Sequence, residues 1–371
     1  MELGCGSVES VVVNLSFWRN RSVFLTGHTG FKGSWLTAWL QRMGARVTGY
    51  ALEPLRSPNM FHQAKIGEGM ESVIADIRDP GLLSSRISSA APEIIFHLAA
   101  QPLVRSSYSD PVETFSTNVM GTVHVLEAAR LASSVRAVVV ITTDKCYEDR
   151  GWPWPYRETD RLGGRDPYAG SKACAELVAR SYRDSFLSAR RVGVATARAG
   201  NVIGGGDWSN DRLLPDIIAS CERDSAVRLR NPDAVRPWQH VLDPLCGYLA
   251  LAERLASAPE RFSEPWNFGP DEQDNVTVRE LAQRAIDLWG GGRIELDEPS
   301  TLHESATLRL DSSKARTLLA WRPRLSFGEA LQWAVDWYKA WAAGGDARQL
   351  VEAQIEHFEE RLENARLPVL Q

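Results

Sequence analysis

Two short groups of polar side chains in this sequence are of the types that transfer protons. The first, Thr143-Asp144-Lys145, offers a hydroxyl, a carboxylate and an ammonium in succession. The second is Tyr168 with Lys172, four residues apart and therefore on one face of a predicted helix. An ammonium near a phenol favours the phenolate and lowers the phenol's pKa, which makes a base for a hydroxyl proton. We expect the two groups to face one another across a single site.

The apolar run before Thr143 is predicted to be a buried strand. Its β-branched residues, within 136–141, are typical of a parallel strand that is covered on both faces. Side chains at the carboxyl end of such a strand point into the crevice where open α/β sheets bind ligands. The long loop that follows, 148–166, is polar and rich in proline, so we expect it to lie over this crevice.

A glycine-rich loop near the start of the chain has the setting of a dinucleotide-binding turn. Gly27, Gly30 and Gly33 lie between a short apolar strand and a predicted helix over 34–43, and a strand over 46–52 completes a β-α-β unit. Without a Cβ, backbone can approach a pyrophosphate closely, and the helix N-terminus faces the anion. The loop therefore predicts a nicotinamide dinucleotide site.

The next two predicted strands, 72–77 and 93–100, end in residues that suit the same cofactor. Asp76 could accept from an adenine amino group, and small residues after the second strand let backbone approach the ligand. Glu53 and Arg56 lie near the position that reads the adenosine ribose, so the residues alone leave NAD and NADP open. The predicted cofactor-binding residues are Gly27, Thr29, Gly30, Phe31, Lys32, Gly33, Asp76, Ile77, Leu98, Ala99, Ala100, Tyr168 and Lys172.

Strands that alternate with helices predict an α/β fold. We expect a doubly wound parallel Rossmann sheet with right-handed crossovers, together with a smaller mixed α/β substrate-binding lobe. The predicted parts are a loose N-terminal extension over 1–16, a cofactor domain over 17–199 plus about 237–258, a lobe over 200–236 plus about 259–342, and a charged, solvated C-terminal helix or tail over 343–371.

Two long helices, 111–131 and 168–187, are predicted beside the sheet. Their periodicity places Phe115, Leu177 and Phe186 among the inward-facing positions. Asn118 lies inside the first stripe, where we expect it to satisfy backbone groups rather than to do chemistry.

Composition excludes several classes of protein. The 371 residues are 44% hydrophobic and 24% charged, with a net charge of −5, which gives no general field for nucleic acid or an anionic membrane. No apolar stretch approaches the ~20 residues that span a bilayer, and the N-terminus lacks a basic leader. The five cysteines are scattered and no HxxxH pair occurs, so we expect no metal site, no disulfide framework and a cytoplasmic protein.

Taken together, these motifs resemble those of the extended short-chain dehydrogenase/reductase superfamily of nucleotide-sugar enzymes, and within it the CDP-glucose 4,6-dehydratases. The resemblance covers roughly residues 15–342. It rests on five stretches: Thr26 to Trp35, Thr143 to Glu148, Asp166 to Glu176, Arg198 to Trp208 and Arg236 to Val241.

The resemblance implies an NAD-dependent lyase that converts CDP-glucose to CDP-4-keto-6-deoxyglucose. It implies that Thr143 and Tyr168 address the sugar 4-hydroxyl, with Tyr168 as the base, and that Lys172 holds the tyrosine and the nicotinamide ribose. It further implies that Lys145 removes the C5 proton while Asp144 protonates the departing 6-hydroxyl.

The role of Lys145 is the most demanding of these. Related TDP-glucose dehydratases carry Glu at the matching position. A free lysine titrates near ~10.4, and lowering its pKa to ~7 requires about 4–5 kcal/mol. The alternative for Lys145 is an ion pair with Asp144 or Glu148 that orients the loop.

Substrate contacts and assembly are also implied. Asn201, Arg212, Arg236 and His303 are the predicted substrate-binding residues, the arginines because a guanidinium suits a pyrophosphate. The helix after Pro111 and the Tyr168 helix commonly pair in this superfamily, so we expect a homodimer or a dimer of dimers.

Three other functions remain open. One is another NAD-dependent dehydratase, such as an inverting UDP-N-acetylhexosamine 4,6-dehydratase, and a second is a 4-epimerase, in which Asp144 and Lys145 would be idle. The third, from a different class, is an NAD-binding regulatory protein, which would not need the complete set of proton-transfer groups.

Overall fold

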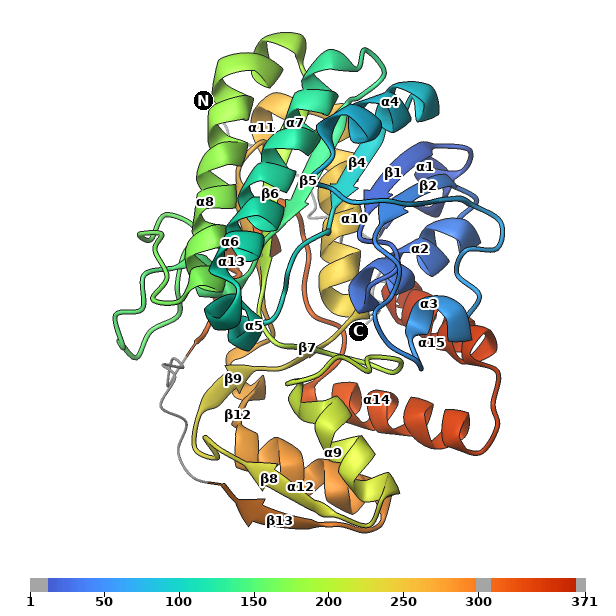
Figure 1. The fold of residues 1–371 in the computed structure, drawn as a ribbon, viewed down its shortest axis with the longest axis vertical. Helices are drawn as coiled ribbons and strands as arrows, with labels where there is room; N and C mark the ends of the chain where they lie inside the picture. The colour runs from blue at the N-terminus through green and yellow to red at the C-terminus, as the bar shows by residue number, and fades with distance from the viewer. Residues whose placement is uncertain (1–12, 298–307, 365–371) are drawn as a thin grey trace, which may run out of the picture.

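The computed structural model describes residues 13–297 and 308–364. Its centre is a seven-stranded parallel sheet in the order β11-β6-β5-β4-β1-β2-β3 (Figure 1). The order reverses between β1 and β4, where doubly wound sheets bind their ligands. The predicted Rossmann sheet is confirmed. Its strands are β1 (Ser22–Thr26), β2 (Arg46–Ala51), β3 (Glu71–Ile74), β4 (Ile94–His97), β5 (Ala137–Ile141), β6 (Gly193–Ala199) and β11 (Pro265–Phe268).

Helices cover both faces of this sheet, because successive strand residues point to opposite sides. On β1, Phe24 shares a core with α4 and α7, whereas Val23 and Leu25 share a core with α2 and α10. In Figure 1, α4, α7 and α8 lie in front of the strands and α10 lies behind them. The main helices are α2 (Phe31–Arg42), α4 (Pro80–Ala90), α7 (Gly121–Leu131), α8 (Pro167–Tyr182) and α10 (Leu242–Ser257).

The predicted helix over 111–131 is a single path in three parts: α6 (Pro111–Phe115), a π-helical turn (Ser116–Met120) and α7. Asn118 lies in the π turn, where Oδ1 accepts from the Gln101 amide at 2.8 Å and Nδ2 donates to Ser171 Oγ at 2.8 Å. It supports backbone and side-chain groups, as predicted.

The prediction that Phe115, Leu177 and Phe186 pack inward is wrong. Their side chains are 40%, 54% and 45% exposed, respectively. A π turn inserts one residue into the helical period, so positions on either side of it fall on different faces. Such turns follow Phe115 and include Phe186, whereas Leu177 lies one position past the buried Glu176.

A smaller set of elements follows β6 and lies below the sheet in Figure 1. It contains three two-stranded pairings and helices that pack on one another, in agreement with a mixed α/β lobe. The elements are β7 (Val202–Ile203) with β10 (Gln239–His240), β8 (Ala226–Leu229) with β13 (Arg293–Leu296), β9 (Val235–Pro237) with β12 (Asn275–Thr277), and the helices α9 (Leu213–Glu222), α12 (Val278–Trp289) and α14 (Phe327–Ala342).

One strand lies outside its predicted part of the chain. β11 pairs with β6 in the central sheet, although 259–342 was assigned to the lobe. The division into domains otherwise stays a proposal.

Several short elements lie between the main helices and strands. These elements are α1 (Leu15–Trp18), α3 (Met60–Gln63), α5 (Val104–Ser109), α11 (Pro259–Phe262), α13 (Ser313–Leu318) and 3-10 turns at Asp144–Cys146, Ser188–Arg190 and Glu272–Asp274, with a second π turn at Arg183–Leu187.

The start of the described chain is not loose. Val13 is 1% exposed, and the Asn14 amide donates to Glu253 Oε1 at 3.0 Å. Val13 and Asn14 are therefore held against the rest of the chain, unlike the loose extension predicted for 1–16, whereas Leu15 is 40% exposed. Residues 1–12 lie outside the described ranges.

The C-terminal segment is helical as predicted, but it is not simply solvated. In α15 (Ala347–Asn364), the positions of Val351, Ile355 and Phe358 form a buried stripe. Glu359 accepts from the Trp39 indole of α2 at 2.8 Å. Charged residues conceal this stripe in the sequence, because only every third or fourth position is apolar. Among the described residues, no helix is long and apolar enough to cross a bilayer.

Candidate active site

A pocket at the carboxyl ends of β1, β4, β5 and β6 brings both proton-transfer groups together with the glycine loop. All predicted site residues in the described ranges line it, and His303 lies outside those ranges. This proximity supports one shared site, while the role of each residue stays a prediction. They are Gly27, Thr29, Gly30, Phe31, Lys32, Gly33, Asp76, Ile77, Leu98, Ala99, Ala100, Thr143, Asp144, Lys145, Tyr168, Lys172, Asn201, Arg212 and Arg236.

The glycine loop is shaped for close backbone approach. Gly27 has φ of 81°, and a Cβ there would lie 2.7 Å from the Ala99 amide nitrogen. A Cβ at Gly33 would lie 2.0 Å from the Gly27 carbonyl oxygen. Helix α2 begins at Phe31, and its N-cap, Gly30, supplies no capping side chain. The loop therefore leaves an uncapped helix N-terminus at the pocket, which fits the pyrophosphate of a dinucleotide.

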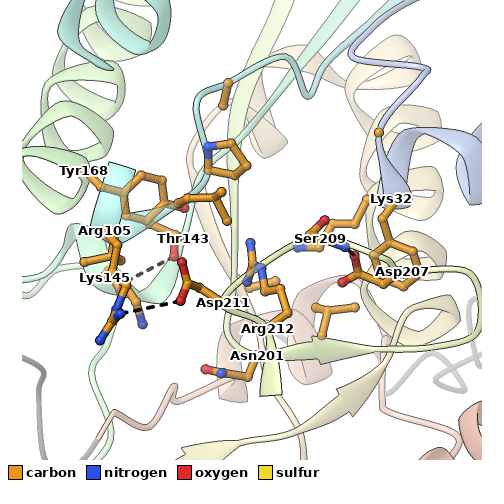
Figure 2. A pocket seen from close by; sticks show the side chains of 18 of the residues that line it. Lys32, Arg105, Thr143, Lys145, Tyr168, Asn201, Asp207, Ser209, Asp211 and Arg212 are labelled. Carbon is orange, nitrogen blue, oxygen red and sulfur yellow. Dashed lines mark hydrogen bonds and ion pairs between the residues drawn. The ribbon is translucent and has the colours of Figure 1, made fainter. Parts of the chain in front are cut away.

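The side chain of Lys32 reaches from the glycine loop toward the lobe. Figure 2 shows its side chain beside Asp207 and Ser209. Burial lowers the pKa of Lys32 to about 7, and Arg212 acts in the same direction, whereas Asp207 opposes it. Lys32 was predicted as a cofactor residue, and its position lies where the glycine loop meets the lobe.

Two residues near the adenosine end have partners within the protein. Asp76 Oδ2 accepts from Arg78 Nη2 at 2.6 Å, and Glu53 pairs with His62 at 3.0 Å. Asp76 and Glu53 both line the pocket. Each carboxylate is therefore oriented by a neighbouring cation or histidine.

The Thr143-Asp144-Lys145 segment turns sharply after β5. Thr143 is the N-cap of a 3-10 turn, its Oγ1 donating to Asp144 Oδ1 at 2.9 Å and accepting from the Lys145 amide at 3.3 Å. Asp144 is 2% exposed, and its Oδ2 has no hydrogen-bond partner in the described part of the chain. A Cβ at Gly200 would lie 3.2 Å from that oxygen, so glycine leaves room for the carboxylate.

Tyr168 and Lys172 lie on the first turns of α8, which Asp166 caps by accepting from the Ala169 amide at 2.8 Å. The Thr143 hydroxyl lies close enough to Tyr168 to lower the pKa of the phenol, so the two proton-transfer groups meet here. Lys172 Nζ donates to the Ile141 carbonyl at 3.1 Å, at the end of β5.

The predicted effect of Lys172 on the phenol is wrong. Burial raises the pKa of Tyr168 to about 12, with Arg212 and the Thr143 hydrogen bond acting in the opposite direction. The largest effect on the phenol is its burial, and the Lys172 ammonium is hydrogen-bonded to the strand carbonyl. Burial in turn lowers the pKa of Lys172 to about 8.

The other end of the pocket is rich in arginine. Arg236, on β9, is 7% exposed, while Arg212 directly precedes α9. Two further arginines were missed: Arg105 and Arg230 lie 3.7 Å and 3.4 Å from Asp211 (Figure 2 shows the first pair). These side chains make a cationic part of the pocket, and Arg212 is near enough to Tyr168 to lower the pKa of its phenol.

A signal for one of the missed arginines was present. In β8, Val227 and Leu229 are buried and Arg228 alternates with them, so Arg230, directly after the strand, continues the alternation of Arg228. Both arginines line the pocket. Arg105 carried no such signal, because its position depends on the path of the chain after β4.

The loop over 148–166 was expected to lie over the pocket. Only a few of its residues line the pocket, so the loop forms part of the pocket's edge. Tyr147 and Tyr156 stack at 5.0 Å, and Trp152 packs beside them. Asp149 and residues 164–166 line the pocket, whereas Trp154 is 58% exposed. Glu148 pairs with Arg150 at 2.9 Å, which holds the loop's first turn.

Comparisons with known proteins agree with this architecture. The chain is 51% identical over 341 residues to the CDP-glucose 4,6-dehydratase of Salmonella typhimurium, covering 90% of this chain and 95% of that protein. It is 28% identical to the UDP-glucose 4-epimerase of Mycolicibacterium smegmatis, over 85% and 97% of the two chains.

Solved structures show the same fold. The dTDP-glucose 4,6-dehydratase of Streptomyces venezuelae, solved with NAD bound, superposes with a TM-score of 0.75 and 25% identity, covering 87% of this chain and 98% of that one. The family model described as GDP-mannose 4,6 dehydratase matches residues 24–333. The chain belongs to this dehydratase family, within the short-chain dehydrogenase/reductase type of nucleotide-sugar enzyme.

Proposed function

We propose that this chain is an NAD-dependent CDP-glucose 4,6-dehydratase that converts CDP-glucose to CDP-4-keto-6-deoxyglucose and water. The observation that carries the proposal is the meeting, in one pocket, of Thr143-Asp144-Lys145, Tyr168 and Lys172 beside the glycine loop. The 51% identity to a CDP-glucose 4,6-dehydratase supports the choice of substrate.

The glycine loop and the small residues after β4 would hold the cofactor. The uncapped start of α2 suits its pyrophosphate, and Ala99 and Ala100 leave space for its flat rings. When bound, NAD supplies a reversible hydride acceptor, so the overall reaction needs no external oxidant. Lys172 would hold the nicotinamide ribose.

Tyr168 and Thr143 would act at the sugar 4-hydroxyl. Tyr168 Oη would take the hydroxyl proton, while the Thr143 hydroxyl holds the same oxygen in place. Because burial raises the pKa of Tyr168 to about 12, the phenol releases its own proton reluctantly, and the cations nearby must offset this. Arg212 contributes in that direction.

Asp144 and Lys145 would carry out the elimination. Oxidation at C4 acidifies the C5 proton, which Lys145 Nζ would remove. Asp144 would give a proton to the 6-hydroxyl, which then leaves as water, and Lys145 would return a proton to C5 as C6 receives the hydride first removed from C4. The unpaired Oδ2 of Asp144, buried at the pocket wall, is the atom best placed to carry the proton for the 6-hydroxyl.

The arginine-rich end would hold the nucleotide. Arg212 and Arg236 would neutralise the pyrophosphate, and Asn201, at the exit of β6, would hydrogen-bond the phosphate or the sugar. Arg105 and Arg230 add two guanidiniums to the same end.

The test is to incubate the purified protein with CDP-glucose and to follow the 4-keto sugar by its absorbance in base at ~320 nm. The expected result is a 4-keto-6-deoxy product from CDP-glucose. Parallel incubations with UDP-N-acetylglucosamine and UDP-glucose separate the alternatives. Formation of CDP-galactose would indicate an epimerase, and no reaction with any of the three sugars would refute the enzymatic proposal.

We also propose that two copies pair through the outer face of α6 and α8, here called the α6–α8 face. Val112, Phe115 and Leu177 are 77%, 40% and 54% exposed on these adjacent helices. Apolar side chains gathered on one face commonly mark an interface. A second copy would bury them through the same face of its own helices.

Leu177→Glu is expected to shift the protein from dimer to monomer in light scattering, because the carboxylate would be buried against apolar groups. Leu318→Glu is the matched control, since Leu318 is 41% exposed on α13, a helix that packs against β11. An unchanged dimer in Leu177→Glu would place the interface elsewhere.

We also propose that the protein is located in the cytoplasm. Cys146, Cys174, Cys221 and Cys246 are all free thiols. Reduced thiols persist in the cytoplasm, whereas oxidising compartments promote disulfides.

A further inference from the structure

A buried carboxylate with four hydrogen bonds lies behind the proton-transfer groups. Glu176 Oε1 accepts from Thr142 Oγ1 at 2.5 Å and from Arg198 Nε at 2.8 Å. Its Oε2 accepts from Thr196 Oγ1 at 2.6 Å and from Arg198 Nη2 at 2.7 Å. Burial alone would raise the pKa of Glu176, but Arg198 and the two hydroxyls outweigh it and lower that pKa. The group is therefore a fully bonded carboxylate.

This carboxylate joins the two segments that carry the chemistry. Thr142 directly precedes Thr143-Asp144-Lys145, and Glu176 lies one turn of α8 beyond Lys172. Lys172 makes a second link between the same elements through the Ile141 carbonyl. The chain fixes distances within each segment, whereas only noncovalent contacts such as these fix the distance between the segments.

The ion pair between Glu176 and Arg198 also holds the C-terminal end of the segment that contains Thr143-Asp144-Lys145. Arg198 Nη1 donates to Tyr147 Oη at 2.7 Å, and its guanidinium lies 4.8 Å from the centre of the Tyr147 ring. Tyr147 Oη donates in turn to Asn267 Oδ1 at 2.7 Å, on β11. Residues 142–147 are thus tied to Glu176 at their start and to Arg198 at their end.

A contribution to stability does not by itself explain why this ion pair is buried here. Arg198 and Glu176 are 2% and 5% exposed, and the cost of removing such charges from water cancels much of their attraction. Geometry is a stronger reason, because reacting groups displaced by about 1 Å can cost on the order of 100-fold in rate.

We propose that Glu176 and Arg198 are positioning residues that set the distance between the Thr143-Asp144-Lys145 segment and the Tyr168-Lys172 segment. The proposal rests on the proton-transfer roles proposed above for those segments. Neither residue lines the pocket, so each would act through Thr142, Tyr147 and α8.

Two threonines offer a matched test. Thr142→Val and Thr196→Val each remove one hydroxyl from the same carboxylate, and both side chains are 4% exposed. Thr142 belongs to the catalytic segment, whereas Thr196 lies on β6 and does not line the pocket. Equal losses of hydrogen bonding should lower Tm by similar amounts in the two variants.

The expected result is that Thr142→Val lowers kcat by about 10-fold or more with KM changed by less than about 3-fold, while Thr196→Val keeps kcat close to that of the wild type. Solvent-deuterium exchange at C5 should fall in parallel with kcat in Thr142→Val. Equal kcat in the two variants at equal Tm loss would overturn the positioning role. A wild type that does not convert CDP-glucose would refute the proposed substrate instead, so the two failures are distinguishable.

Discussion

The two ends of the pocket are built on different principles. At the proton-transfer end, Asp144 and Tyr168 are 2% and 8% exposed, and hydrogen bonds of 2.5–3.1 Å tie their segments to Glu176 and the end of β5. At the arginine-rich end, Arg105 and Asp211 are 38% and 37% exposed and lie 3.7 Å apart. Exposed pairs of this kind contribute about 0–1 kcal/mol, whereas buried networks resist rearrangement. The comparison indicates that the part of the pocket around Asp144 and Tyr168 is held more rigidly than the exposed Arg105–Asp211 pair, whereas Arg236 is buried like the proton-transfer groups.

The largest effect is expected at the rigid end. Lys145→Met should lower kcat by about 1,000-fold, since general acid–base groups contribute roughly 100- to 10,000-fold. Oxidation at C4 should persist, and C5 solvent-deuterium exchange should be lost, because only the C5 proton transfer depends on the amine. Rapid-quench mass spectrometry of the sugar in D2O measures both.

Lys339→Met, which alters a lysine on α14 outside the pocket, is the control for this prediction. Normal C5 exchange in Lys145→Met would assign the base to another group. The alternative role of Lys145, in orienting the loop, would instead reduce oxidation and exchange together.

Much of the rigid end could be predicted from the sequence. Gly27 to Gly33 and Thr143 to Lys145 each follow a strand directly, so local spacing places them at the same edge of one parallel sheet. The electrostatics could not be predicted, since burial is the largest cause of the raised pKa of Tyr168 and burial depends on the tertiary packing around the phenol.

The arginine-rich end was predicted less completely. Arg105 and Asp211 are 106 positions apart, and only the tertiary path brings them together. Phe115 on α6 was likewise assigned inward, because the π turn that follows it changes the helical period without leaving a mark in residue types. Sequence spacing therefore locates chemistry on strand ends better than it locates recognition on loops.

An effect of intermediate size is expected from low pH, which should lower the stability of the fold through the buried His97. His97 is 2% exposed, between Thr26 at 2.8 Å and Thr122 at 3.1 Å, and burial lowers its pKa to about 3. An unfolded histidine titrates near ~6.5, so the unfolded state binds the additional proton first. Stability should therefore fall as the pH drops from ~6.5 toward 3, by roughly 2 kcal/mol at pH 5 from this residue.

His97→Gln should reduce this acid sensitivity, measured as the difference in urea unfolding free energy between pH 7 and pH 5. His357→Gln is the control, because the His357 side chain is 73% exposed. If the two variants lose equal stability between the two pH values, the acid sensitivity originates outside the strand ends around His97.

The smallest effect is expected at the exposed Arg105–Asp211 and Arg230–Asp211 pairs, where the Asp211 carboxylate would compete with a substrate phosphate for the two guanidiniums. Asp211→Asn should lower KM for CDP-glucose by about 2- to 3-fold with kcat unchanged, which corresponds to the weak free energy of exposed pairs. The difference should shrink as salt approaches ~1 M, where the Debye length is about 3 Å. Asp233→Asn, which alters another exposed partner of an arginine outside the pocket, should leave KM unchanged. A KM that rises in Asp211→Asn would mean that the carboxylate organises the arginines for the substrate, and that this end of the pocket is as preformed as the other.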